Sequence, residues 1–179
     1  MEDRRLIHRC KRGDRDAFCR LYEKYSDLLF TVAIALLRDG SAAEDAVQDV
    51  FVQFAEKMAD FRLTGSLKAY LSVCVANRAK NVLASRKKDC TLSETQVIPA
   101  TSLNPEQQII CNEELRQVAE AMEQLPIEQR QVIALHHYSQ MSLRAIARSL
   151  ELSPNTAKRR YRYGMDKLRQ LLNDREVTK

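Results

Sequence analysis

Four polar side chains, one or two helical turns apart, are the first groups in this sequence that could do chemistry: Asp45, Gln48, Asp49 and Glu56. Carboxylates at such spacing can hold a metal ion or act as general acid and base. The three histidines of the chain lie elsewhere, however, so nothing completes such a site. We expect no catalytic residue, no metal and no cofactor. The acidic stretch is then either a solvated surface or a surface for docking another protein.

Other common reaction centres are missing from the sequence. The five cysteines include no C-x-x-C pair, which favours scattered reduced thiols over a zinc site or a disulfide framework. Neither G-x-G-x-x-G nor G-x-x-x-x-G-K-[ST] occurs, and this argues against the common nucleotide-binding enzymes. The sequence therefore points away from an enzyme.

Aromatic, cationic and amide side chains interleave between residues 61 and 88. They are Phe61, Tyr70, Asn77, Arg78, Lys80, Asn81, Arg86 and Lys87. Bases of a single strand can stack on rings while cations follow the nucleic-acid backbone. The two rings could equally belong to a hydrophobic core, so this segment alone permits nucleic acid without requiring it.

Residues 142–163 have the layout of a helix-turn-helix. Ile146 and Ala147 face inward on a short first helix, and Pro154 opens the second, where its missing N–H costs nothing. The second helix presents Asn155, Thr156, Lys158, Arg159, Arg160 and Arg162. In this motif such residues enter the major groove, contact base edges and neutralise phosphates. The alternative is an ordinary helical hairpin with a solvated basic face.

Charge is segregated along the chain. Residues 39–60 hold six acids and one base, whereas residues 141–170 hold eight bases and two acids. A single polar surface would mix its signs. We expect one face for a basic partner and another for an acidic partner, within a net charge of +5.

Helical periodicity positions these groups. Apolar spacing predicts a helix over residues 14–37 capped by Asp14, a second capped by Ser41 with Glu44 completing a capping box, and a third from Ser66 to about Lys88. Further helices are expected over residues 111–125, 127–138, 142–150 and 154–172. With four glycines, four prolines and no convincing strand, an all-β fold is improbable.

Between the two helical groups, residues 89–110 contain two prolines, three acids and no lysine or arginine. This composition is typical of an extended linker. We therefore expect an all-α protein of two small domains, residues 1–88 and 111–179, joined by a flexible tether at 89–110 and behaving independently.

Taken in order, these segments resemble the extracytoplasmic-function (ECF, group four) class of bacterial RNA polymerase sigma factors. The run A-F-x-x-L-Y-x-x-Y at residues 17–25 looks like the opening of sigma domain two. The run A-E-D-A-V-Q-D-V-F at 43–51 is similar to the family motif that docks on the polymerase clamp. The run L-P-x-x-x-R-x-V-x-x-L at 125–135, with the helix-turn-helix, looks like sigma domain four.

The resemblance implies roles for the residues named above. The acidic group of residues 45–56 would contact core polymerase, and the group of residues 61–87 would capture the melted −10 strand. The second helix of the helix-turn-helix would read the −35 element as duplex. Core RNA polymerase and promoter DNA would be partners, together with an anti-sigma protein of the kind that holds many members inactive.

The chain also departs from the family pattern. Tyr70 stands where the family usually has Trp, and Asn81 and Ala84 replace a common Asp and Arg. Tyr163 replaces a usual Arg in the recognition helix, and Arg159 replaces a usual small residue. The family's −35 preference is therefore not transferable to this chain.

The residues alone also allow a second function. The chain could be a stand-alone helix-turn-helix regulator whose N-terminal helices sense a ligand or dimerise. Such a regulator would have no need for the acidic face at residues 45–49. The charged N-terminus carries no secretory signal, and the longest apolar run, residues 28–37, is shorter than the roughly 20 residues of a membrane span. We expect a cytoplasmic protein without membrane insertion.

Overall fold

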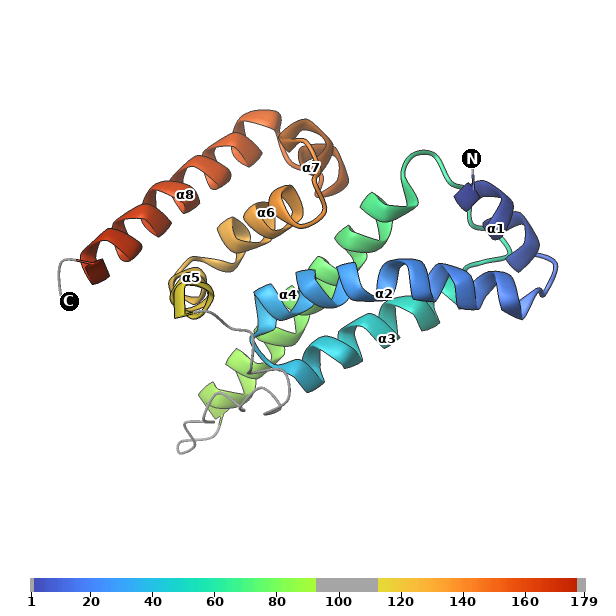
Figure 1. Ribbon diagram of the computed structural model, residues 1–179, viewed down its shortest axis with the longest axis horizontal. Coiled ribbons are helices and arrows are strands. Elements are labelled where there is room, and N and C mark those ends of the chain that lie inside the picture. Colours follow the sequence, from blue (N-terminus) through green and yellow to red (C-terminus); the bar gives the residue numbers. More distant parts are fainter. Residues whose placement is uncertain (1, 93–112, 177–179) are drawn as a thin grey trace.

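The computed structural model describes residues 2–92 and 113–176 (Figure 1). Within these ranges the only regular secondary structure is helical, which confirms the predicted all-α class. The helices are α1 (Glu2–Cys10), α2 (Arg15–Leu37), α3 (Gly40–Glu56), α4 (Leu67–Leu92), α5 (Glu113–Glu123), α6 (Ile127–His137), α7 (Leu143–Ser149) and α8 (Pro154–Glu176). None of the described helices is long and apolar enough to span a membrane.

Two aspartates cap α2 and α3. Asp14 accepts a hydrogen bond from the Ala17 N–H at 3.0 Å, which confirms its predicted role at the start of α2. The prediction of Ser41 as the next cap is wrong. Asp39 has an extended backbone and accepts from the Ala42 N–H at 3.0 Å, so Ser41 already lies inside α3.

Two other boundaries differ from the sequence reading. The helix α1 was not expected, because in a short, highly charged segment only Leu6 and Ile7 are buried. At the other end, α4 continues to Leu92, into the stretch expected as a linker. The remainder of that stretch, residues 93–110, lies outside the described residues.

The first four helices share one core built around α2. Leu21, Leu29 and Leu36 of α2 are fully buried, and α1, α3 and α4 all pack against this helix. Phe54 of α3 and Leu71 of α4 close the core from the other side. Because α3 buries one stripe of apolar residues against this core, its opposite side faces away from the core.

The last four helices pack with α8 along their outer edge (Figure 1). Gly164 permits close contact with α6, since a Cβ at this position would lie 2.7 Å from Ile133 Cδ1. The turn before α8 places Glu151 in the left-handed region at φ 54°. Ile146 and Ala147 are buried, as predicted.

The two groups of helices contact one another through α6. This helix packs against α2 and α4, and its Val132 and Leu135 belong to the same hydrophobic cluster as the α2–α4 core. The buried Arg130 guanidinium donates to the carbonyl oxygens of Leu36 at 2.8 Å and Glu123 at 2.7 Å. In this structure the two groups therefore pack against each other through α6.

Candidate docking and nucleic-acid surfaces

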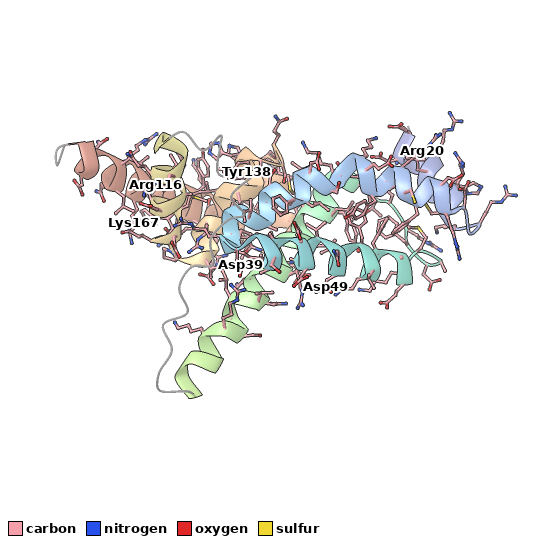
Figure 2. The ribbon with its side chains drawn as sticks, turned by 60° about the horizontal axis from the view of Figure 1, so that its bottom comes forward. Arg20, Asp39, Asp49, Arg116, Tyr138 and Lys167 are labelled. Carbon is pink, nitrogen blue, oxygen red and sulfur yellow. The ribbon has the colours of Figure 1, made fainter. Side chains whose placement is uncertain are left out.

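The acidic face of α3 lies opposite the stripe that the helix buries. Asp45, Gln48 and Glu56 are exposed on it. Asp49, labelled in Figure 2, is only half-buried, but its Oδ2 atom lies 2.6 Å from Arg78 Nη2 of α4. Three of the four residues expected here thus face solvent, and the fourth bridges to a residue that we expected to bind DNA.

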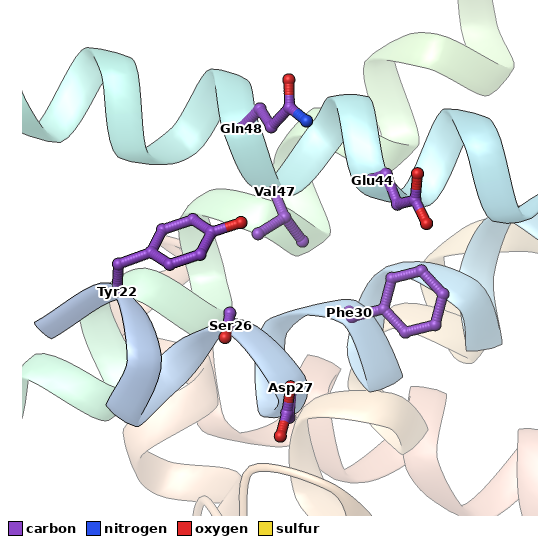
Figure 3. A pocket seen from close by; sticks show the side chains of 7 residues that line it. All are labelled: Tyr22, Ser26, Asp27, Phe30, Glu44, Val47 and Gln48. Atoms are coloured by element: carbon purple, nitrogen blue, oxygen red, sulfur yellow. The ribbon is translucent and has the colours of Figure 1, made fainter. Parts of the chain in front are cut away.

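A groove of about 260 Å³ runs between α2 and α3 beside this face (Figure 3). Its lining residues are Tyr22, Ser26, Asp27, Phe30, Glu44, Val47 and Gln48. Val52, one turn after Gln48 on α3, is a further exposed apolar residue, at 56% exposure. The groove combines rings with carboxylates, so it suits a partner that presents both apolar and cationic side chains. Phe30, Glu44 and Val52 were not among the expected site residues.

Two rings form an aromatic pair at the start of α4. The centroids of Phe61 and Tyr70 lie 5.0 Å apart, and the buried Phe54 supports the pair with its ring 5.0 Å from that of Phe61. Tyr70 is 36% exposed and Phe61 is half-buried. The pair is therefore partly core and partly surface, and Tyr70 is the more exposed of its two rings.

Cations of α4 are held by carboxylates of the first helical group. Arg78 pairs with Asp49, as described above, and Arg86 Nη2 lies 2.7 Å from Asp39 Oδ2. The backbone N–H of Ala42 and the Arg86 guanidinium lower the pKa of Asp39. These two ion pairs neutralise charges that were expected to face DNA.

Two more residues of α4 are engaged by α6. Asn77 Oδ1 accepts a hydrogen bond from Gln131 Nε2 at 2.8 Å, and Lys80 Nζ lies 3.3 Å from Glu128 Oε1. Burial acts to raise the pKa of Glu128, but hydrogen bonds from its own N–H and from Lys80 outweigh it and lower the pKa. No sequence signal indicated these contacts, because 48 to 54 residues separate the partners. Asn81 and Lys87 are exposed.

The helix-turn-helix presents its polar residues as expected. Asn155, Lys158, Arg159 and Arg162 are exposed on α8, whereas Thr156 and Arg160 are half-buried. Ser153 Oγ caps α8 by accepting from the Thr156 N–H at 3.0 Å. Because Pro154 is the first residue of the helix, the predicted geometry of this turn is confirmed.

The described part of the chain shows no arrangement suited to a metal ion. No three or more His, Cys, Asp or Glu side chains are grouped closely enough there to hold one. Cys10, Cys19 and Cys74 are free thiols.

Known proteins provide an independent comparison. The sequence matches the family model of sigma-70 region 2 over residues 21–89 and that of sigma-70 region 4 over residues 115–168. It is 25% identical over 169 residues to the RNA polymerase sigma-H factor of Pseudomonas aeruginosa, covering 89% of this chain and 88% of that one. It is 24% identical over 182 residues to the ECF RNA polymerase sigma factor SigW of Bacillus subtilis, covering 96% and 97%.

Two solved structures share the fold. One is CnrH in complex with the cytosolic domain of CnrY, with a TM-score of 0.73 and 23% identity, covering 97% of this chain and 99% of that chain. The other is the sigma factor RpoE of Bartonella quintana in complex with the anti-sigma factor NepR, with a TM-score of 0.74 and 24% identity, covering 87% and 96%. Both likenesses extend over both groups of helices.

Proposed function

Because this chain belongs to the sigma-70 family as an ECF RNA polymerase sigma factor, we propose that it binds core polymerase and directs initiation at promoters with a specific −35 duplex and a melted −10 strand. Sigma factors are regulatory rather than catalytic, so the polymerase supplies the chemistry. Bacterial polymerase and DNA occupy the cytoplasm, where the protein would act. A stand-alone regulator is not favoured, because the family matches cover both groups of helices.

Core polymerase would dock on the acidic face of α3. Asp45, Gln48 and Glu56 are exposed there, and the groove between α2 and α3 adds apolar contact surface. Carboxylates arranged in this way attract a cationic partner and fix its register, while buried apolar contact supplies affinity. Asp49 would contribute through its position beside Arg78.

The melted −10 strand would lie along the N-terminal half of α4. Phe61 and Tyr70 supply stacking surface, and base–aromatic stacking contributes about 1–3 kcal/mol per base. Asn81 and Lys87 are exposed and lie further along the same helix. The cations Arg78, Lys80 and Arg86 would neutralise phosphates once they leave their carboxylate partners.

Access to that strand surface depends on α6. Gln131 donates a hydrogen bond to the Asn77 amide oxygen, and Glu128 forms an ion pair with Lys80. A DNA strand would therefore compete with α6 for both residues. Binding of the −10 strand at these positions would therefore require α6 to move away from α4. We propose residues 1–88 and 111–179 as the units that separate, with residues 89–110 as the tether and the first boundary inside the last turn of α4.

The −35 element would be read by α8. Asn155, Thr156, Lys158, Arg159, Arg160 and Arg162 cluster in the N-terminal half of this helix, which enters the major groove in helix-turn-helix proteins. An anti-sigma protein is a further proposed partner, because the similar RpoE is held in a complex of this kind.

The observation that carries the proposal is one chain with an acidic docking face and a basic recognition helix, within matches to both sigma regions. The test is run-off transcription with purified core polymerase, on templates selected from a promoter library by the holoenzyme. We expect the wild-type chain to convert inert core into a promoter-specific initiator.

A charge reversal separates docking from folding in this assay. Asp45→Arg should weaken core binding at least tenfold in a pull-down, because an exposed carboxylate would become a like charge facing a basic partner. Asp16→Arg, at an exposed acid in the first turn of α2, is the matched control and should bind as wild type. Equal binding by Asp45→Arg, with normal helix content, would exclude this face.

A further inference from the structure

Tyr163 is an exposed aromatic residue on the outward side of the recognition helix α8. Its side chain is 46% exposed, so burial in the core does not account for it. The residue lines a groove between α6 and α8 together with Gln129, Thr156, Arg159 and Arg160. The ring therefore lies among the side chains that we assign to the −35 element.

Two arginines pair with this ring. The guanidinium carbon of Arg159 lies 5.7 Å from the ring centroid, and that of Arg162 lies 5.0 Å from it. Both distances fall within the roughly 6 Å at which the face of a ring attracts a cation. The hydrogen bond from Arg162 and the charge of Arg159 lower the pKa of the Tyr163 phenol. The two cations therefore interact with the phenol oxygen as well as with the ring.

The pairing orders side chains that would otherwise be mobile. Within the described residues, neither Arg159 nor Arg162 forms a salt bridge. A long arginine loses rotamer freedom when it binds DNA, and part of that cost is removed when the guanidinium is already held. The ring holds two such groups on the face of α8 that would meet the duplex.

We propose that Tyr163 is a positioning residue for DNA reading. Its ring holds the Arg159 and Arg162 guanidinium groups toward the major groove, where arginine bonds guanine edges. This inference rests on the proposed −35 function of α8. The preference of α8 for a particular DNA sequence then depends on the Tyr163 ring, although the ring itself need not touch a base.

The test uses holoenzyme formed from core polymerase and the full-length chain. The specific probe is a duplex that wild-type holoenzyme selects from a pool with a randomised −35 region, and its scrambled version is the non-specific probe. Tyr163→Leu removes the ring face and keeps apolar bulk, whereas Tyr163→Phe keeps the ring. Tyr138→Leu changes another exposed tyrosine, at the end of α6, and is the matched control.

We expect Tyr163→Leu to weaken binding to the specific duplex about 5- to 30-fold, because both guanidinium groups would then be ordered only on binding. Tyr163→Phe and Tyr138→Leu should stay within about twofold of wild type. Binding to the scrambled duplex and its salt dependence should not change in any variant, because phosphate contacts are retained. A loss caused only by misfolding would instead weaken both probes and lower the helix content.

A double-mutant cycle decides whether the ring acts through the arginines. In an Arg159→Ala/Arg162→Ala background, Tyr163→Leu should have no further effect. The same loss in that background would mean that the ring contacts a base directly, and would overturn the positioning role. Wild-type affinity for Tyr163→Leu on the selected duplex would overturn this inference alone. Failure of wild-type holoenzyme to select any −35 sequence would overturn the proposed function of α8 as well.

Discussion

The cations of α4 and those of α8 are prepared for nucleic acid in different ways. Arg78, Lys80 and Arg86 of α4 lie 2.6, 3.3 and 2.7 Å from carboxylate oxygens of the same chain. Lys158 and Arg162 of α8 have no carboxylate within salt-bridge distance among the described residues. The α4 surface is thus neutralised from within, whereas the α8 surface presents its charge directly.

The difference follows from where each helix lies. The helix α4 is flanked by the acidic α3 and by α6, while α8 runs along the outer edge of the second group (Figure 1). Partners of α4 must therefore displace intramolecular contacts before they gain new ones. In contrast, DNA approaching α8 meets cations such as Lys158 and Arg162 that no carboxylate of the described residues neutralises, and their long-range attraction speeds encounter.

Removal of Arg130 should have the largest effect, because this residue joins the two groups. It is 8% exposed and donates to three carbonyl oxygens, those of Leu36, Glu123 and Leu125. Arg130→Met keeps the volume but leaves these acceptors without their donor, and should lower the free energy of unfolding by about 3 kcal/mol. Thermal unfolding followed by circular dichroism measures the loss.

The neighbouring Arg38 provides the control for this change. It forms an exposed ion pair with Glu123 at 2.6 Å across the same contact. Arg38→Met should cost less than about 1 kcal/mol, because exposed ion pairs contribute little. Equal losses for the two variants would show that α6 is held by surface charge and not by the buried guanidinium.

Matched lysine variants test the contrast between the two surfaces directly. Lys158→Ala should weaken binding of the full chain to duplex DNA about fivefold and reduce the salt slope by about 0.9, the loss of one phosphate contact. Lys80→Ala should change neither the affinity for duplex DNA nor the salt slope, because Lys80 is already paired with Glu128. Fluorescence anisotropy at two salt concentrations provides both quantities. A drop in slope for Lys80→Ala would contradict the view that α4 is neutralised.

Acid should weaken the contact between α3 and α4. The pKa of Asp39 is lowered in the folded chain. The Asp39 carboxylate therefore stabilises the fold at pH values above its unfolded pKa near 3.9, and this stabilisation is lost as the pH falls through its folded pKa. At neutral pH Asp39→Ala should lower the free energy of unfolding by about 1 kcal/mol, and this difference should shrink below about pH 3.9.

A second variant separates the two roles of Asp39. Asp39→Asn keeps an acceptor for the Ala42 N–H and removes the charge that faces Arg86. It should recover most of the stability that Asp39→Ala loses, since asparagine caps helices about as well as aspartate. Urea unfolding across pH measures both variants. A pH-independent difference between wild type and Asp39→Ala would mean that the carboxylate charge contributes nothing.

The smallest expected effect concerns the contact between α6 and α4. Glu128→Gln removes the carboxylate beside Lys80 and should raise the affinity of the free chain for a single-stranded oligonucleotide about twofold. Glu151→Gln, an exposed acid in the turn before α8, changes net charge equally and is the control. If the two variants gain equally, the gain reflects net charge alone and not release of Lys80.

The sequence by itself determined where α2 to α8 lie along the chain and the kind of surface that α3 and α8 present. Apolar periodicity and the cap at Asp14 predicted α2, and the proline at position 154 predicted the start of α8. These signals succeed because each depends on residues within a few positions of one another. The charge segregation was readable directly from the residue types.

Where two local signals competed, nothing in the local residue pattern could decide between them. Ser41 and Asp39 are both good caps, and Asp39 caps α3 because Arg38 turns the chain through a left-handed conformation just before it. The helix α1 was missed because its two buried residues acquire a partner only when α2 lies beside them.

Only the tertiary structure decided which polar groups are free. Asp49 and Arg78 were expected to face different partners, yet they pair with each other across 29 positions of sequence. Asn77 meets Gln131 across 54 positions, and no local pattern reports such a distance. An ion pair depends on which helices cross and at what register, and crossing is fixed by the packing of the whole core. Residue type therefore established what each surface could bind, and packing established which of its charges are already occupied.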